Sequence, residues 1–207
     1  TPNPAMWPMW RGPFAYGQAT ADKTLLMTPT LRGGGGEDFP RCEDLPMADV
    51  RESLAVVAPA DAVYDLVADL PRMGEWSPEC ERVTWRGDAT SAVSGAQFLG
   101  YNRAGVVRWM TQGEVVTAEP GRHLAFEIRV GPMKIARWEY FIVPDDADPS
   151  TCIVVEEWTD RRPAWYRELA DRAFGPRTKS NERGMVKTLA NLKVAAEAAA
   201  NDGQFRS

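Results

Sequence analysis

The chain has 207 residues, of which 44% are hydrophobic and 26% are charged, a composition that excludes a collagen-like or wholly disordered protein. Its formal net charge is −5, and because nucleic-acid-binding domains usually carry a basic surface, we expect no nucleic-acid partner. A chain of this length predicts one main domain with a sizeable core of its own.

Residues 1–46 differ in composition from the rest of the chain. They contain seven prolines and six glycines, and four of those glycines form the run 33–36. No apolar periodicity connects these residues, so we expect a Pro/Gly-rich leader that is flexible or partly ordered. Its composition fits either a native arm or an appended segment. Four aromatic residues of the leader could dock on a surface or a partner: Trp7, Trp10, Phe14 and Tyr16.

The region before residue 80 predicts a strand over 50–58 and two short helices over 60–68 and 72–76. The strand segment alternates loosely between apolar and polar side chains and stops at a proline. The first helix has apolar side chains at helical spacing, with Asp61 as a candidate N-cap. The second helix ends before a proline, which disfavours helical geometry in the residue that precedes it.

Six further strands are predicted in series. Short segments rich in Gly, Pro or Asp separate them, which is typical of antiparallel strands joined by tight turns. The expected strands are 81–86, 96–102, 107–117, 122–130, 135–143 and 151–158.

After Pro163 the spacing of apolar residues becomes helical. One helical segment has Trp165, Leu169 and Ala173 spaced by four and ends at Gly175-Pro176. The long helix that follows has an apolar stripe of Met185, Leu189, Leu192 and Ala196. Only this helix is long enough to cover one face of a seven-stranded sheet. We therefore predict an α+β domain over 47–200, in which a curved antiparallel sheet wraps around a long C-terminal helix, and a tail over 201–207.

Five segments and the order of the elements point to a known superfamily. The start of the first helices reads VAPADAVYDLVADL at 57–70 and MGEWSPEC at 73–80; the strands contain GAQFLGYNR at 95–103, ARWEY at 136–140 and VEEW at 155–158. These segments resemble the START, birch-pollen-allergen and polyketide-cyclase superfamily (SRPBCC), and its bacterial polyketide cyclase/dehydrase-like branch in particular. The resemblance covers about residues 50–198 and implies a helix-grip fold with an internal hydrophobic cavity. It does not imply one activity, because the superfamily includes cyclases, lipid carriers and binding proteins.

Strand alternation then decides which side chains would face such a cavity. The inward rows combine aromatic side chains with few polar groups, as expected of a site for a flat, largely apolar ligand. The predicted ligand-binding residues are Trp76, Phe98, Asn102, Trp109, Thr111, Phe126, Trp138, Tyr140 and Trp158. Aromatic residues at strand spacing also occur in filled cores, so a core without a cavity is the alternative.

Glu156 is the candidate catalytic residue. We expect its side chain on the same strand face as Trp158, where burial would raise its pKa or require a cationic partner. It would then act as a general acid or base, or accept a hydrogen bond from a ligand hydroxyl. The alternative is a structural ion pair with Arg103 or Arg137.

The other reactive residue types point to no further site. His123 is the only histidine, which excludes a three-histidine zinc site, and we expect it in an exposed turn. The cysteines have no paired spacing, and Cys80 and Cys152 are expected to be small buried side chains. We therefore expect no metal and no cofactor. Three cations near the Gly175-Pro176 break could meet an acidic group of a ligand at a cavity mouth: Arg172, Arg177 and Lys179.

We expect a cytoplasmic protein, because the sequence shows neither a secretory signal nor a run of about 18 apolar residues that would span a membrane. A monomer or a homodimer is expected. The expected function is to bind a hydrophobic or polycyclic small molecule, polyketide-like or lipid-like, as a carrier or self-protection protein of secondary metabolism such as antibiotic biosynthesis. The alternatives are a polyketide cyclase/aromatase or dehydratase enzyme, and a partner-binding module that uses the aromatic leader. Sparse acid/base groups favour binding, although a hollow fold can promote cyclisation largely by positioning.

Overall fold

A computed structural model describes residues 48–202 of the chain, so the expected leader and almost all of the expected tail lie outside the described residues. The elements are β1 (Val50–Val56), α1 (Ala60–Ala68), the 3-10 helix η1 (Leu70–Glu75), β2 (Cys80–Trp85), β3 (Gln97–Ala104), β4 (Val107–Glu119), β5 (His123–Val130), β6 (Met133–Pro144), β7 (Cys152–Asp160), α2 (Ala164–Phe174) and α3 (Arg177–Asn201). The predicted elements are all present, with ends that differ by a few residues.

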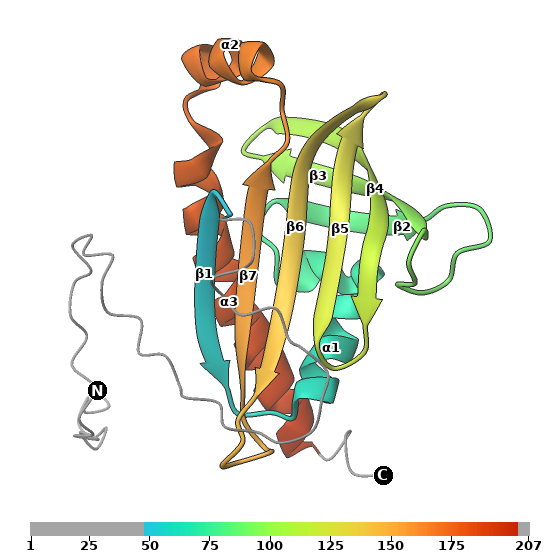
Figure 1. Cartoon of the computed structure of the whole chain (residues 1–207), viewed down its shortest axis with the longest axis vertical. Coiled ribbons are helices and arrows are strands. Elements are labelled where there is room, and N and C mark those ends of the chain that lie inside the picture. Colours follow the sequence, from blue (N-terminus) through green and yellow to red (C-terminus); the bar gives the residue numbers. More distant parts are fainter. Residues whose placement is uncertain (1–47, 203–207) are drawn as a thin grey trace, which may run out of the picture. The chain divides into compact units, whose positions relative to one another are not determined.

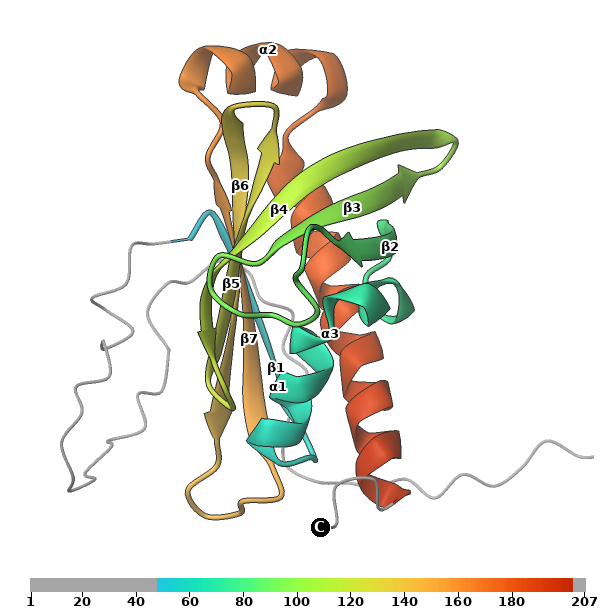
Figure 2. The same ribbon diagram turned by 90° about the vertical axis from the view of Figure 1, so that its right-hand side faces the viewer.

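The strands form one seven-stranded antiparallel sheet in the order β1-β7-β6-β5-β4-β3-β2. Consecutive strands from β2 to β7 are neighbours, and the chain places β1, its first strand, beside β7, its last. The sheet curves, and α3 runs along its concave side, as Figures 1 and 2 show for the red helix. The predicted helix-grip arrangement is therefore confirmed.

Helix α1 forms because its apolar side chains recur at helical spacing and are buried against the sheet. The N-cap is Pro59, which makes no side-chain cap hydrogen bond, so the expectation that Asp61 caps this helix is wrong. Asp61 lies instead in the first turn, where its charge interacts favourably with the helix dipole. Gly121 lies beside it with φ +72°, and a Cβ at Gly121 would collide with the Asp61 carboxylate.

The main core lies between α1, the sheet and the C-terminal half of α3. Leu189, Leu192 and Ala196 of α3 belong to the same buried cluster as Leu124 of β5 and Val154 of β7. In the N-terminal half of α3, Met185 is buried in a second, smaller cluster. Its neighbours Asn181, Gly184 and Thr188 are small or polar, so this half leaves part of the concave face of the sheet uncovered. This change along one helix determines where the fold leaves space.

Helix α2 differs from an ordinary core helix. The sequence shows an apolar spacing of four in this segment, but Trp165 is 67% exposed and Leu169 is 63% exposed. Figures 1 and 2 show α2 at one end of the sheet, beyond the tips of the hairpins. Within residues 48–202, no helix is long and apolar enough to cross a membrane.

Candidate functional site

A pocket of about 710 Å³ lies between the concave face of the sheet and the N-terminal half of α3. Strands β3 to β7 form its wall, because alternate side chains of each strand point to the same side. The ends of β2 and η1 close one side, and residues of α2 and α3 close another. Its lining passes from fully buried residues such as Tyr140 to half-exposed ones such as Val130, so the pocket has a floor and a mouth.

The structure brings nine of the ten predicted site residues to this pocket. They are Phe98, Asn102, Trp109, Thr111, Phe126, Trp138, Tyr140, Glu156 and Trp158. They lie on one face of the sheet, as the predicted alternation along each strand requires. The strand register agrees, because it places most of these residues opposite one another on neighbouring strands. Whether these residues bind a ligand stays a prediction.

Trp76 is the exception, because it does not line the pocket. It is 1% exposed and belongs to the main core, where its backbone carbonyl accepts a hydrogen bond from Asn191 Nδ2 at 3.0 Å. The Arg72 guanidinium lies 5.9 Å from its ring. Trp76 follows η1 directly, and this short helix turns the indole into the core beneath α3.

The position of the aromatic ring of Phe98 in the pocket wall depends on Gly113 of the neighbouring strand. Phe98 and Phe126 meet edge to face with ring centroids 5.6 Å apart, and Trp138 and Trp158 lie 6.4 Å apart. The Phe98 ring lies over Gly113 of β4, where any Cβ would collide with it. Gly113 therefore lets Phe98 lie flat against the sheet, which keeps the space in front of the ring open.

Two polar side chains on the wall satisfy each other. Asn102 Nδ2 donates to Thr111 Oγ1 at 3.2 Å and to the Gly100 carbonyl at 3.4 Å. Gly100 lies between them on β3 and adds no side chain of its own. The pair leaves the Asn102 carbonyl oxygen and the second lone pair of Thr111 for a ligand.

Glu156 lies at the floor of the pocket and is 2% exposed. The Tyr140 hydroxyl donates to Glu156 Oε1 at 2.7 Å, whereas Glu156 Oε2 has no hydrogen-bond partner among the described residues. Burial raises the pKa of the Glu156 carboxyl to about 8, and nearby Glu52 adds to the shift, while the Tyr140 hydrogen bond opposes it. Glu156 is therefore largely protonated at neutral pH.

Neither arginine that was considered as a partner of Glu156 pairs with it. Arg103 pairs instead with Glu81, at 3.3 Å between Nε and Oε1. Arg137 pairs with Glu139 on the other face of the sheet, at 2.9 Å between Nε and Oε2. The alternative of a structural ion pair at Glu156 is therefore wrong, because both arginines belong to other pairs.

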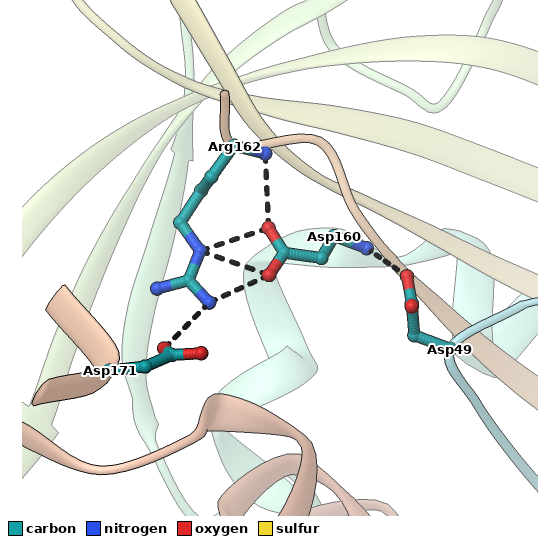
Figure 3. Close-up of polar contacts among 4 residues, drawn as sticks. All are labelled: Asp49, Asp160, Arg162 and Asp171. Atoms are coloured by element: carbon teal, nitrogen blue, oxygen red, sulfur yellow. Dashed lines mark hydrogen bonds and ion pairs between the residues drawn. The ribbon is translucent and has the colours of Figure 1, made fainter. Parts of the chain in front are cut away.

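The cations at the mouth are compensated by carboxylates. Arg177 Nη2 lies 3.0 Å from Glu79 Oε2 and ties the start of α3 to the segment before β2. Figure 3 shows Arg162 between Asp160 and Asp171. Arg162 Nη2 lies 2.6 Å from Asp160 Oδ2 and 3.1 Å from Asp171 Oδ1. These pairs hold the connection from β7 to α2 against the end of the sheet.

The expected group of three cations at the break before α3 divides in the structure. Arg177 lines the pocket, whereas Arg172 is exposed on α2 and pairs with Glu168. Lys179 is exposed and does not line the pocket. The three residues therefore do not form a joint anion site.

Sequence analysis missed the helix side of the pocket. Asn181, Gly184 and Thr188 of α3 line it, and Asn181 and Thr188 are buried although they are polar. Asn181, Gly184 and Thr188 recur at spacings of three and four, and this row lies beside the predicted apolar stripe of the helix. A small or polar row beside an apolar helix stripe was the signal that could have revealed them.

Of the remaining reactive side chains, Cys80 lines the pocket, whereas His123 and Cys152 do not. His123 Nε2 lies 3.3 Å from Glu139 Oε1, and its ring stacks on Phe141 at 4.2 Å, so it is not in the exposed turn that was expected. Cys80 and Cys152 are buried free thiols, as predicted, and burial raises both pKa values to about 11. Within residues 48–202 no cluster of three His, Cys, Asp or Glu could hold a metal ion.

Residues 47–197 match the model of a family described as polyketide cyclase / dehydrase and lipid transport. No protein of curated function matches the chain. A polyketide-cyclase-like protein from Corynebacterium glutamicum, Cgl2372, is 30% identical, with a TM-score of 0.44 and coverage of 78% of this chain and 96% of Cgl2372.

Two solved structures with low identity show the same fold. StfQ, a di-domain ARO/CYC from the steffimycin biosynthetic pathway, is 14% identical with a TM-score of 0.52, over 75% of this chain and 46% of StfQ. The chain thus spans about half the length of StfQ. TTHA0849 from Thermus thermophilus is 17% identical with a TM-score of 0.52, over 72% of this chain and 97% of TTHA0849.

Proposed function

Because the chain belongs to the polyketide cyclase / dehydrase and lipid transport family, we propose that it binds a planar, largely apolar small molecule of polyketide-like or lipid-like structure in the pocket. In this proposal it is a carrier or a self-protection protein of secondary metabolism. Its location in the cytoplasm and its state as a monomer or homodimer stay predictions.

The observation that carries this proposal is the pocket itself. A volume of about 710 Å³ falls in the range of sites for drug-sized ligands, and most of the wall is aromatic or aliphatic. On the sheet side, the buried polar groups are concentrated at two places, the Asn102–Thr111 pair on the wall and the Tyr140–Glu156 pair at the floor. Such an arrangement would orient a flat ligand that has polar atoms at its ends.

An enzymatic role is the second candidate, either as a polyketide cyclase/aromatase or as a dehydratase. The protonated carboxyl of Glu156 favours it, because a neutral acid at the floor could donate a proton to a ligand carbonyl or hydroxyl. Binding remains the first proposal because the pocket has no second carboxylate or histidine at its floor, among the described residues, to complete an acid/base pair. Turnover of a linear polyketone, measured by the appearance of aromatic product, separates the two roles.

A fluorescence titration with polycyclic aromatic compounds and fatty acids tests the proposal. We expect quenching of Trp138 and Trp158, a rise in the thermal midpoint, and dissociation constants near micromolar, which correspond to about −8 kcal/mol. Trp138→Phe should reduce the quenching. Trp165→Phe is the matched control, because Trp165 lies outside the pocket and is 67% exposed. A broad panel that changes neither fluorescence nor midpoint would refute the proposal.

A further inference from the structure

A second carboxylate lies beside the floor of the pocket. The inner row of β1 is Val50, Glu52, Leu54 and Val56, in which Glu52 interrupts a series of apolar side chains. In the sheet, Glu52 lies directly opposite Glu156 of β7. Directly opposed residues point to the same face with Cβ atoms roughly 5 Å apart, so the two carboxyl groups are close neighbours.

Neither carboxylate has a compensating cation in the part of the chain that the structure describes. Within residues 48–202, none of the groups that shift the pKa of Glu52 or Glu156 is a cation. The neighbours of the pair are themselves acidic groups. The negative charge of Glu182 on α3 repels that of Glu52, and the Tyr140 hydroxyl of β6 donates a hydrogen bond to Glu156. Cys80 of β2 is a further acidic neighbour, and its electrostatic interaction with Tyr140 raises the pKa of the Tyr140 hydroxyl. Burial and Glu182 raise the pKa of Glu52, which agrees with a site that lacks positive charge.

The mouth of the pocket shows the opposite situation. Arg162 and Arg177 contribute positive charge to its lining, and each is held by carboxylates of this chain. A ligand therefore meets neutralised charge at the entrance, and at the floor it meets the carboxyl group of Glu156, which no cation compensates. Glu156 Oε2 has no hydrogen-bond partner among the described residues. In the ionised form of the carboxyl group, this oxygen would accept a hydrogen bond from a ligand.

Two indole rings stand next to this point. Trp138 and Trp158 are cross-strand partners, and the next inward pair along the same two strands is Tyr140 and Glu156. The faces of tryptophan rings attract cations, most strongly where water is excluded. The floor thus combines a buried carboxyl group with aromatic rings, which is the chemistry that recognises an organic ammonium group.

We infer that the ligand carries a basic amino group, which as an ammonium ion donates to Glu156 Oε2 beside the rings of Trp138 and Trp158. This inference rests on the proposed binding function and names the class of ligand. Glu52 does not line the pocket, and it acts through its field, which favours a cation at the floor. The apolar skeleton of the ligand then extends along the aromatic wall.

Binding of an ammonium group at Glu156 would change the number of protons that the protein holds. Because Glu156 is largely protonated at neutral pH when the pocket is empty, an ammonium ligand displaces its carboxyl proton to the solvent as the ion pair forms. Binding of an amine at pH 7 therefore releases up to one proton per ligand. A neutral ligand that accepts a hydrogen bond from the Glu156 carboxyl releases none.

The test uses 1-pyrenemethylamine and its near-isostere 1-pyrenemethanol on the full chain. Isothermal titration calorimetry at pH 7, in two buffers with different ionisation enthalpies, gives both the affinity and the number of protons released. We expect the amine to bind at least tenfold more tightly than the alcohol, with proton release for the amine alone. Glu156→Gln should abolish both differences, and Glu52→Gln should reduce the preference. Glu182→Gln, on the exposed side of α3, should change the preference less than Glu52→Gln does.

Three outcomes would overturn the inference. If the alcohol binds as tightly as the amine without proton release, the floor is a neutral hydrogen-bond donor, and the proposed binding function still stands. If the preference survives Glu156→Gln, the ammonium group lies elsewhere. If neither compound nor the wider panel binds, the proposed function itself fails. The proton count on the unmodified chain separates an ion pair from a neutral hydrogen bond even where a variant folds poorly.

Discussion

Gly184 offers the most direct test of the pocket, because filling it should stabilise the protein and weaken ligand binding at the same time. Gly184 lies within α3 and lines the pocket, and a Cβ at this position would meet no other atom within 4 Å. A leucine there would extend into open space. Glycine within a helix is about 0.5–1 kcal/mol less favourable than alanine or leucine, so the substitution removes a local penalty.

The expected gain in stability for Gly184→Leu is about 0.5–1 kcal/mol, which raises the thermal midpoint by roughly 1–4 °C for a domain of this size. The leucine side chain competes with the ligand for the same space, so affinity should fall at least tenfold, or about 1.4 kcal/mol. Thermal unfolding followed by circular dichroism and a fluorescence titration measure the two effects. Gly184→Ala should gain stability without losing affinity, and Lys187→Leu, on the exposed side of α3, should leave affinity unchanged.

The opposite signs of the two effects make the result informative. A variant that misfolds loses both stability and binding, whereas a blocked pocket loses binding alone. If Gly184→Leu binds the ligand as tightly as the unmodified chain, the ligand does not occupy this pocket. If the variant is strongly destabilised, the space beside Gly184 is not open, and the description of the pocket is wrong.

Charge and chain organisation lead to four further expectations. The free energy of unfolding should fall by up to about 1.4 kcal/mol per pH unit between pH 4.5 and 8, because Glu156 keeps a proton in the folded protein that it has lost in the unfolded chain. In urea titrations at several pH values, Glu156→Gln should flatten this dependence on pH. Burial raises the pKa of Glu139, but its hydrogen bonds to a histidine and an arginine lower it to about 2. The ionised carboxylate therefore stabilises the folded protein above about pH 4.5, and this stabilisation is lost as the pH falls towards 2. Glu139→Gln should reduce the loss. Asp171→Asn removes one of the two carboxylates on Arg162 and should lower hydrogen-exchange protection in α2 without shifting the midpoint by more than about 2 °C. A chain that starts at Met47 should unfold cooperatively with nearly the midpoint of the full chain, and a large drop would show that the leader packs into the core.

The walls of the pocket were predictable because they depend on local alternation. Side chains of a strand alternate between its two faces, so the aromatic row of β6 fixes the inward side of that strand without any knowledge of its neighbours. The same rule places Phe126 and Trp158, and all of these residues line the pocket. Trp76 does not lie in a strand, and its direction depends on how η1 turns, which alternation cannot decide.

The acidic floor was not predictable in full, because it depends on pairing between the two ends of the sheet. Glu52 comes from β1 and Glu156 from β7, more than a hundred residues later, and only the register of that pair brings them together. In the sequence, Glu52 looks like an ordinary polar position of a half-exposed strand. Its proximity to a second carboxylate is a property of the tertiary structure.

The ion pair between Glu156 and Arg137, which the structure excludes, could have been rejected from the sequence by strand alternation. Arg137 directly precedes Trp138, which was assigned to the inward face, so the same rule directs Arg137 to the opposite face and away from Glu156. The structure places it there, paired with Glu139. With that arginine excluded and Arg103 held by Glu81, what remains within residues 48–202 is a buried carboxyl group without a cation. A protein keeps such a group at a cost in stability, and this cost is the physical reason for the inference that a ligand supplies the missing positive charge.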